Sequence, residues 1–324
     1  MKSITKLLAF TTLSLSTAIC AANPVPYSPY ADITMDAHWS NGDNDMEPGD
    51  LVKVSQDSGV KSYHLAFIVD QGQCTPAWAG LADYSVSKAW ASRLTKDLRD
   101  HQINYYVSLG GAAGNDLSMA CNDEQLLAAY EKIIQTYQPM GLDFDIENGT
   151  ANAAKVIHAL QQVQKNHPQL KLSFTLPVMP EGLVSAGQDL VQQAQAANLN
   201  YSVNLMTMDF GPGYTGSMGD YAVQAATQVK LFLQRLYPEQ SEATLWSRVE
   251  VTPMIGVNDV STEEFTLADV DTLRTFAQQK QIGGLAMWSI SRDKPCAAKW
   301  ASGICSGDNL QSHDYEYSQR FDKV

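Results

Sequence analysis

The chain has 324 residues, of which 35 are acidic and 22 are basic, and its formal net charge is −13 at neutral pH. A surface so rich in negative charge repels nucleic acid and anionic membranes, so we expect neither as a partner. The length fits one large domain, which can bury a substantial core without depending on disulfides to fold.

The first 22 residues have the composition of a secretory signal peptide. Two lysines precede the apolar run Leu7–Ile19, and the small residues of Ala18–Ala22 close the segment. The run is shorter than the ~20 residues needed to cross a bilayer. The sequence therefore predicts a signal peptide at 1–22 and a mature protein secreted outside the cell or into a periplasm, with no membrane attachment. Lipid attachment at Cys20 is the weaker alternative, because a bulky residue precedes it.

Residues 23–324 alternate short apolar runs with longer amphipathic ones. The apolar runs are rich in Val, Ile, Leu, Met and Phe and do not alternate cleanly with polar residues, as is typical of parallel strands buried on both faces. Eight such runs with helical crossovers predict a single α/β domain, a (β/α)8 TIM barrel, with its site at the strand C-termini. A doubly wound open sheet is the alternative. The runs are Ile33–Trp39, Tyr63–Val69, Ile103–Leu109, Gly141–Ile146, Leu170–Pro177, Tyr201–Met208, Val249–Ile255 and Gly284–Ile290.

Four of the intervening segments carry clear helix boundary signals. Residues whose side chains cap helices precede the first two, and proline or glycine follows three of the four. The predicted helices run from Asn122 or Asp123 to Tyr137, from Thr150 to Asn166, from Gly219 to Tyr237 and from Leu267 to Gln281.

Four cysteines lie in the predicted mature chain, an even number that favours two disulfides in a secreted protein. Cys296 and Cys305 are close in sequence and form the expected local pair. Cys74 and Cys121 follow the second and third predicted strands, which are neighbours in a barrel, and form the other pair. Four buried free thiols are the alternative.

Asp143, Asp145 and Glu147 form a row of carboxyl groups at the end of the fourth predicted strand. Side chains alternate between the faces of a strand, so all three share one face, which points inward in a barrel. Because three half-buried carboxylates repel one another, at least one should keep a proton near neutral pH, as a general acid requires. A cation site is the alternative. No histidine cluster accompanies the row, so we expect neither a metal nor a cofactor.

Four short motifs in chain order resemble those of glycoside hydrolase family 18, the chitinase family. Met140–Glu147 resembles its Asp-Gly-x-Asp-x-Asp-x-Glu strand, and Ser108–Gly111 resembles its Ser-x-Gly-Gly motif. Met206–Asp209 resembles its Met-x-Tyr-Asp motif, and Trp288 stands where the family has a tryptophan on the eighth strand. The pattern is closest to a bacterial and archaeal branch that carries Met-Thr-Met-Asp. The resemblance spans nearly the whole mature chain and implies a barrel glycosidase.

The resemblance also implies a role for each catalytic candidate. Glu147 would protonate the leaving glycosidic oxygen and then activate water, while the substrate's own N-acetyl oxygen attacks the sugar. Asp145 would orient the acetamido group, and Asp143 would lie beneath it and exchange a proton or hydrogen bond. Asp209 would help to bind the acetamido group.

Other candidates are expected at the substrate-binding surface. The resemblance places Trp288 and Met206 there, and Trp39 is a candidate for an outer subsite, as is Trp78. Met208 replaces the family's tyrosine, so Tyr214 is a candidate to supply the missing hydroxyl.

For several residues the sequence allows two interpretations, one structural and one functional. We expect Ser108, Gly110 and Gly111 to be structural, as small residues at a crowded barrel end, rather than to act on the substrate. Asn258 and Asp259 either reach the cleft or cap the loop that follows the seventh strand.

These expectations combine into a secreted, monomeric chitinase that acts on chitin or on N-acetylglucosamine oligosaccharides. An endo-β-N-acetylglucosaminidase acting on N-glycans is the second enzymatic hypothesis. A catalytically inactive chitinase-like carbohydrate-binding protein is the non-enzymatic one, which the presence of Glu147 disfavours.

Overall fold

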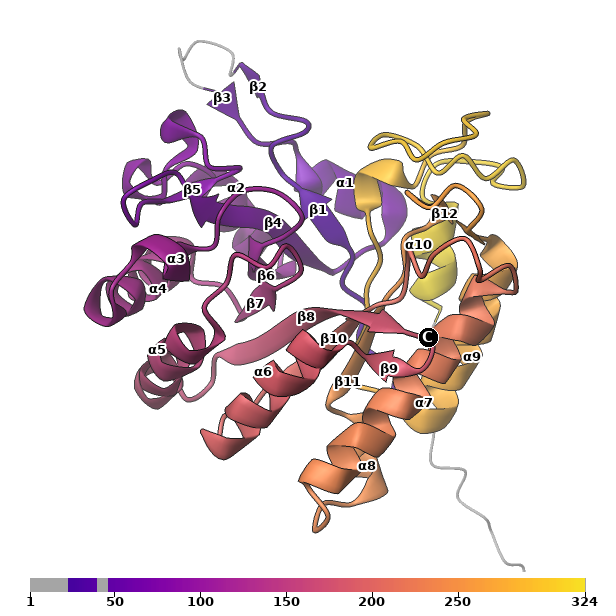
Figure 1. Ribbon diagram of the computed structural model, residues 1–324. Helices are drawn as coiled ribbons and strands as arrows, with labels where there is room; N and C mark the ends of the chain where they lie inside the picture. The colour runs from indigo at the N-terminus through magenta and orange to yellow at the C-terminus, as the bar shows by residue number, and fades with distance from the viewer. Residues whose placement is uncertain (1–22, 40–45, 324) are drawn as a thin grey trace, which may run out of the picture.

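Eight parallel strands follow one another around a single curled sheet (Figure 1). The structure is a computed structural model that describes residues 23–39 and 46–323, so the predicted signal peptide lies outside the described residues. Within those ranges the strands are, in order around the sheet, β1 (Tyr30–Asp32), β4 (Ser62–Asp70), β6 (Asn104–Gly110), β7 (Gly141–Asp145), β8 (Lys171–Met179), β10 (Ser202–Met206), β11 (Val249–Thr252) and β14 (Gly284–Leu285).

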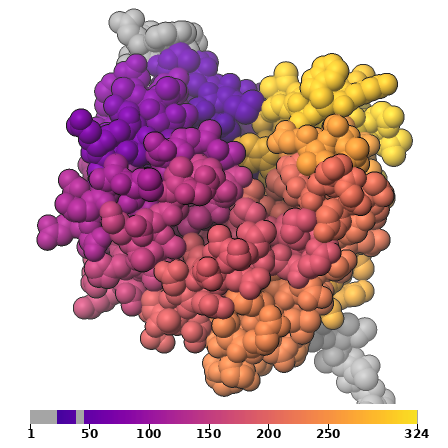
Figure 2. Space-filling view, viewed as in Figure 1, coloured from indigo at the N-terminus to yellow at the C-terminus, as the bar shows by residue number. Residues whose placement is uncertain are grey.

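Backbone hydrogen bonds between the first and last strands close the sheet into a barrel. The Ser28 N–H donates to the Leu285 carbonyl at 2.9 Å, and the Tyr30 N–H donates to the Met287 carbonyl at 3.0 Å. Consistent with this closure, the indigo N-terminal and yellow C-terminal segments lie side by side in Figure 2. The predicted (β/α)8 TIM barrel is therefore confirmed, because an open doubly wound sheet would leave these edges apart.

Helices cover the outside of the barrel (Figure 1). The boundary signals placed the four predicted helices within a few residues. Asn122 caps α4 through a capping box with Gln125. The predicted cap at Thr150 is wrong, because Asn152 accepts the Lys155 N–H and begins α5 instead. The helices are α1 (Leu51–Ser58), α2 (Ser92–Asp100), α3 (Leu117–Ala120), α4 (Asp123–Tyr137), α5 (Ala153–Asn166), α6 (Ser185–Ala196), α7 (Met218–Leu236), α8 (Glu242–Trp246), α9 (Leu267–Lys280) and α10 (Glu316–Phe321).

The first strand lies earlier in the chain than the sequence predicted. The run Ile33–Trp39 is mostly a turn, and Tyr30–Asp32 forms the strand. The turn has a local cause, because the Asp32 carboxylate accepts hydrogen bonds from the Thr34 N–H at 3.0 Å and from its hydroxyl at 2.6 Å. An aspartate that bonds two residues ahead favours a turn over continued pairing.

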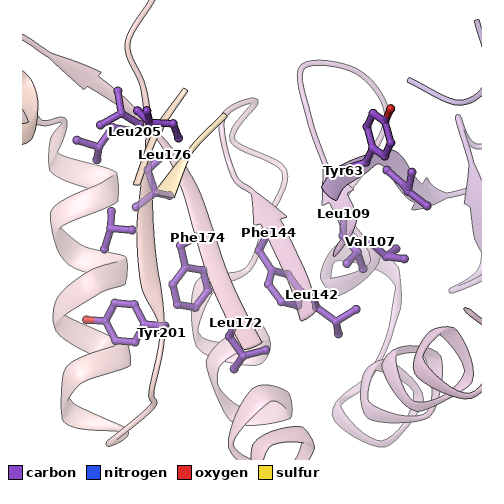
Figure 3. Packing of buried hydrophobic residues seen from close by; sticks show 14 of the residues in the cluster. Tyr63, Val107, Leu109, Leu142, Phe144, Leu172, Phe174, Leu176, Tyr201 and Leu205 are labelled. Carbon is purple, nitrogen blue, oxygen red and sulfur yellow. The ribbon is translucent and has the colours of Figure 1, made fainter. Parts of the chain in front are cut away.

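Alternation along the strands separates an apolar outer layer from a polar interior. Leu142 and Phe144 of β7 are fully buried between the sheet and the helices, where Phe144 packs at a ring-centroid distance of 6.0 Å from Phe174 of β8 (Figure 3). The residues between them, Asp143 and Asp145, must then point into the barrel. The apolar packing of one face thus fixes the inward direction of the acidic row.

Short elements extend several strand C-termini. They are β2 (His38–Trp39) paired with β3 (Met46–Glu47), β5 (Pro76–Trp78), β9 (Gly182–Leu183), β12 (Gly256–Val257) paired with β13 (Glu264–Phe265), and the 3-10 turns η1 (Ala82–Tyr84), η2 (Val86–Lys88) and η3 (Ile290–Arg292). None of the helices in the described ranges combines the length and the apolar composition that a membrane span requires.

Both predicted disulfides are confirmed. Cys74 pairs with Cys121 across a Cα–Cα distance of 4.8 Å and 47 residues of chain. Cys296 pairs with Cys305 across 5.9 Å and nine residues.

The longer of these two loops should contribute more to stability. A disulfide restricts the unfolded chain in proportion to the logarithm of the loop it closes, which gives about 4 kcal/mol for the first bridge and about 2.5 kcal/mol for the second. We therefore expect Cys74→Ser/Cys121→Ser to lower the free energy of unfolding more than Cys296→Ser/Cys305→Ser, as measured by urea titration. The reverse order would contradict this assignment of stability.

Candidate active site

The lowest carboxyl of the acidic row, Asp143, is fully buried and fully bonded. The Tyr30 hydroxyl donates to its Oδ2 at 2.8 Å, and the Ser173 and Thr175 hydroxyls donate to its Oδ1 at 2.7 Å. Three hydroxyl donors supply the hydrogen bonds that a buried carboxyl needs. Asp143 is therefore held rigidly beneath the rest of the row.

Asp145 is buried, with 6% of its surface exposed, yet its Oδ1 has no hydrogen-bond partner in the described structure. Burial raises its pKa well above the usual range, and the charges of Glu147 and Asp143 add to this effect. The raised pKa favours the protonated form of the side chain, and its Oδ1 is a buried polar atom that a bound molecule can contact.

Glu147 follows β7 and is half-buried. Burial is the largest cause that raises its pKa, followed by the negative charges of Asp209 and Asp259. A carboxyl group with a raised pKa near a cavity has the property that a general acid requires.

A cavity of about 190 Å³ lies at the C-terminal ends of the strands and brings most of the predicted residues together. Asp145, Glu147, Asp209, Met206 and Trp288 all line it, whereas Asp143 lies beneath. Residues that the sequence did not single out complete the wall; they are Tyr30, Phe67, Ala112, Thr175, Thr252 and Met254. Among the described residues, no group of three or more His, Cys, Asp or Glu side chains is arranged to hold a metal ion.

One side of the cavity is aromatic. The half-buried Trp288 stacks on Phe67 with ring centroids 5.7 Å apart, and Tyr30 packs against both rings. Aromatic faces pack well against the apolar faces of sugar rings, so this wall suits a carbohydrate. Phe67 and Tyr30 were missed because Phe67 reads as strand core and Tyr30 lies outside the predicted first strand.

The candidate binding residues Tyr214 and Trp78 do not line the cavity. The Tyr214 hydroxyl donates to Glu181 at 3.0 Å, and the residue does not line the cavity. Trp39 belongs to β2, but its side chain lies outside the described part of the chain. Trp78 is fully buried and donates to the Tyr137 hydroxyl at 2.9 Å, so its role is packing.

The backbone geometry at the end of the third strand, β6, explains why glycine occurs there. Gly110 adopts a φ of +97°, and a Cβ atom there would lie 2.1 Å from the Asp145 carbonyl oxygen. The next amide, of Gly111, donates to that same oxygen at 3.0 Å. Only glycine permits so close an approach, which supports the backbone immediately before Glu147.

Asp209 and the loop after the seventh strand meet at the cavity rim. The Asp209 Oδ1 accepts the Val260 N–H at 2.8 Å. Asp259 is exposed and lines the cavity, whereas Asn258 is buried and donates to the Met254 and Gly256 carbonyls. Each of the two interpretations of this pair therefore applies to one residue: Asp259 reaches the cavity, and Asn258 holds the loop.

A larger cavity of about 420 Å³ lies at the opposite end of the barrel. Its lining includes His64, Lys171 and Glu250, but none of the four carboxyls named as catalytic candidates. In TIM barrels the chemistry is built at the C-terminal ends of the strands, so we assign the active site to the smaller cavity.

Two curated proteins resemble the chain. It is 30% identical over 316 residues to the probable bifunctional chitinase/lysozyme of Escherichia coli (strain K12), covering 91% of this chain and 34% of that protein. It is 30% identical over 289 residues to Endochitinase 11 of Metarhizium anisopliae, covering 84% of this chain and 53% of that protein. The chain thus spans about a third and about half of the lengths of these relatives. No family model matches it.

Solved structures extend the comparison to whole domains. The catalytic domain of the hyperthermophilic chitinase from Pyrococcus furiosus matches with a TM-score of 0.81 and 35% identity, covering 94% of this chain and 96% of that one. The catalytic domain of a family GH18 chitinase from the fern Peteris ryukyuensis shares the fold at a TM-score of 0.55 and 14% identity, covering 92% and 98%. With such identity to a chitinase domain over nearly the full length of both chains, the protein belongs to the chitinase family, glycoside hydrolase family 18.

Proposed function

We propose that the protein is a secreted, monomeric chitinase whose single catalytic domain, residues 23–324, hydrolyses β-1,4 linkages between N-acetylglucosamine units. The observation that carries this proposal is the unpartnered Oδ1 of Asp145, buried in a cavity beside Glu147 and Trp288. An acetamido group brings polar atoms to such a site, and the sugar ring brings an apolar face to the tryptophan. The two disulfides support passage through an oxidising compartment.

The chemistry divides into two balanced steps. Glu147 gives its proton to the glycosidic oxygen, and the bond between that oxygen and the anomeric carbon breaks, so that the leaving sugar departs with a hydroxyl group. The acetamido oxygen of the sugar that carries the anomeric carbon attacks this carbon and forms an oxazolinium ion. Glu147, now ionised, then takes a proton from a water molecule that attacks the anomeric carbon and reopens the ring with retained configuration. Family 18 thus differs from most glycosidases, in which a second carboxylate of the enzyme acts as the nucleophile or as the base.

The remaining carboxyls hold the reacting group. Asp145 bonds the acetamido N–H and places its oxygen for attack, and Asp143, fixed by Tyr30, exchanges a proton or hydrogen bond with Asp145. Asp209 contacts the acetamido group, which its position on the cavity wall supports. Trp288 packs against the sugar ring, and Met206 fills the wall beside it.

A structural relative supports oligosaccharides as ligands. Catalytic-site mutants of active domain 2 of the thermostable Pyrococcus furiosus chitinase, complexed with chito-oligosaccharides, match with a TM-score of 0.82 at 34% identity. That match covers 94% of this chain and 96% of the other.

Incubation of the purified protein with chitin oligomers and with a high-mannose glycopeptide tests the proposal. We expect cleavage of the oligomers and an intact glycopeptide, with products identified by mass spectrometry. Cleavage of the glycopeptide between its two core sugars, with intact oligomers, would instead identify an endo-β-N-acetylglucosaminidase. No cleavage of either substrate would contradict the enzymatic proposal.

The raised pKa of Glu147 predicts how activity depends on pH. A general acid must be protonated, so kcat should fall as pH rises through the pKa of Glu147. The negative charge of Asp259 helps to raise that pKa. Asp259→Asn should therefore move the alkaline limb of the kcat profile to lower pH by a few tenths of a unit, a small shift because the side chain is exposed.

A distant substitution with the same charge change separates this effect from net charge. Glu239 is exposed and lies between α7 and α8, at the opposite end of the barrel. Glu239→Gln should leave the profile unchanged. An alkaline limb that stays fixed in Asp259→Asn, or that moves equally in both variants, would contradict the role given to Asp259.

A further inference from the structure

Glu263 is a buried carboxylate that belongs to none of the sequence motifs and does not line the cavity. It lies between β12 and β13, with 2% of its surface exposed. Its Oε2 accepts the Phe210 N–H at 3.1 Å, and its Oε1 accepts the Gly211 N–H at 2.7 Å. Both carboxylate oxygens are thus engaged by successive amides of the turn that begins at Asp209. Charge-assisted bonds of this kind are among the stronger hydrogen bonds in proteins.

The contact between the two loops is reciprocal. The Asp209 carboxylate accepts the Val260 N–H at 2.8 Å, while Glu263, three residues later, bonds the amides that follow Asp209. The Glu263 N–H also donates to the Val260 carbonyl at 2.8 Å, which closes the second loop on itself. Each loop therefore supplies a carboxylate that holds the backbone of the other.

The turn at Asp209 has a left-handed backbone at two of its residues, Asp209 and Gly211. Asp209 has a φ of +52°, in the left-handed region that side chains other than those of asparagine and aspartate rarely adopt, and Gly211 has a φ of +112°. This conformation decides where the Asp209 carboxyl stands in the cavity wall. A conformation of this kind persists when surrounding contacts determine it, and the Glu263 bonds are such contacts.

We propose that Glu263 is a positioning residue that holds the Asp209–Gly211 turn and so fixes the Asp209 carboxyl relative to Glu147. This inference rests on the proposed function, in which Asp209 and Glu147 act on the substrate. Glu263 itself touches neither substrate nor reacting atoms. Its effect on the reaction must pass through Asp209, and this requirement makes the inference testable.

The charged groups around Glu147 come from several elements. Asp145 and Asp143 extend from β7, Asp209 follows β10, and Asp259 follows β12, with the buried Arg292 of η3 near the last two. The pKa of Glu147 is raised by burial, then by Asp209 and Asp259. If Glu263 holds Asp209 in place, loosening the turn moves the Asp209 charge away from Glu147. The pKa of Glu147 is then raised less by Asp209 and becomes lower.

Glu263→Gln is the variant that tests the inference. Glutamine keeps the size of the side chain, but its amide group has one acceptor oxygen, so one of the two turn amides would face another donor. We expect kcat on a chito-oligomer to fall about tenfold or more, with a smaller change in KM, because small misplacements of catalytic groups are costly. The alkaline limb of the kcat profile should also move to lower pH.

The neighbouring residue provides a matched control. Glu264 is exposed and makes none of the turn contacts, so Glu264→Gln changes the same charge one position away. Its kcat and pH profile should equal those of the wild type. A loss in Glu264→Gln as large as that in Glu263→Gln would overturn the specific role of Glu263.

A double-mutant cycle distinguishes positioning from general stability. If Glu263 acts through Asp209, then Glu263→Gln should have little further effect on kcat once Asp209→Asn is present. A loss of the same size in both backgrounds would overturn the inference. So would a lowered Tm in Glu263→Gln with unchanged kcat and an unchanged pH profile.

A measurement that needs no turnover separates this inference from the proposed function. Carbon-13 NMR of labelled glutamate carboxyls, with Glu147 assigned from the Glu147→Gln spectrum, follows the pKa of Glu147 in the free protein. We expect a lower pKa in Glu263→Gln and no change in Glu264→Gln. If the wild type cleaves no chito-oligomer, the proposed function fails, and this titration still decides whether Glu263 positions Asp209.

Discussion

Glu147→Gln should lower kcat on chito-oligomers by about two to four orders of magnitude while leaving oligomer binding largely intact. The substitution keeps the shape of the side chain and removes the proton that the leaving oxygen needs, and general acid catalysis alone is worth roughly a hundredfold or more. Steady-state kinetics give kcat, and isothermal titration calorimetry with a chito-oligomer gives the dissociation constant.

The binding measurement serves as the control for a damaged fold. A variant that binds the oligomer as tightly as the wild type and turns over slowly has lost only the chemical step. Retention of more than about a tenth of the wild-type kcat would refute Glu147 as the proton donor, because the loss of kcat would then be far smaller than the hundredfold or more expected.

The second large effect concerns the nucleophile. We expect that a chito-oligomer with a free amine in place of the acetamido group at the cleaved sugar is not hydrolysed there. The amine has no carbonyl oxygen to attack the anomeric carbon, so substrate-assisted catalysis has no route. Mass spectrometry of the products from defined, partly deacetylated oligomers reads the cleaved position directly, and a thiazoline analogue of the intermediate should inhibit the enzyme.

A two-carboxylate mechanism makes the opposite prediction. Its carboxyl groups lie roughly 5 to 5.5 Å apart and one attacks the sugar directly. Asp145 is poorly placed for this because it ends β7 only two residues before Glu147 and reaches the cavity from the same segment, which leaves Asp209 as the other carboxyl of the motifs. Efficient cleavage beside an unacetylated sugar, or a trapped Asp209 glycosyl ester, would replace the substrate-assisted mechanism and leave Glu147 as the acid.

Where one physical signal dominated, the sequence was sufficient to predict the structure. Buried parallel strands produce continuous apolar runs, and seven of the eight runs coincide with strands of the barrel. The acidic row could be placed because strand alternation turns Asp143 and Asp145 of β7 inward, and Glu147 follows two residues after the strand and lines the cavity. The Cys74–Cys121 disulfide followed from the order of strands around a barrel, and the Cys296–Cys305 disulfide followed from closeness in sequence.

The remaining features depend on contacts that no local pattern records. The turn at Asp32 places the first strand earlier in the chain than the sequence predicted. Tyr30, whose hydroxyl holds Asp143, was therefore not recognised as a site residue. Tyr214 was expected to supply a hydroxyl to the substrate, but its own hydroxyl is bonded to Glu181. Glu263 has no sequence signal at all, because its partners are backbone amides 52 and 53 residues away.

The stereochemical course of chito-oligomer hydrolysis by the wild-type protein tests the central claim most directly. Time-resolved proton NMR of chitotetraose with a stoichiometric excess of substrate reports the anomer at the newly formed reducing end before it equilibrates in water. Attack by the acetamido oxygen followed by water inverts the anomeric carbon twice, so the account predicts that the β-anomer appears first. Initial release of the α-anomer, or the absence of any cleavage, would contradict it.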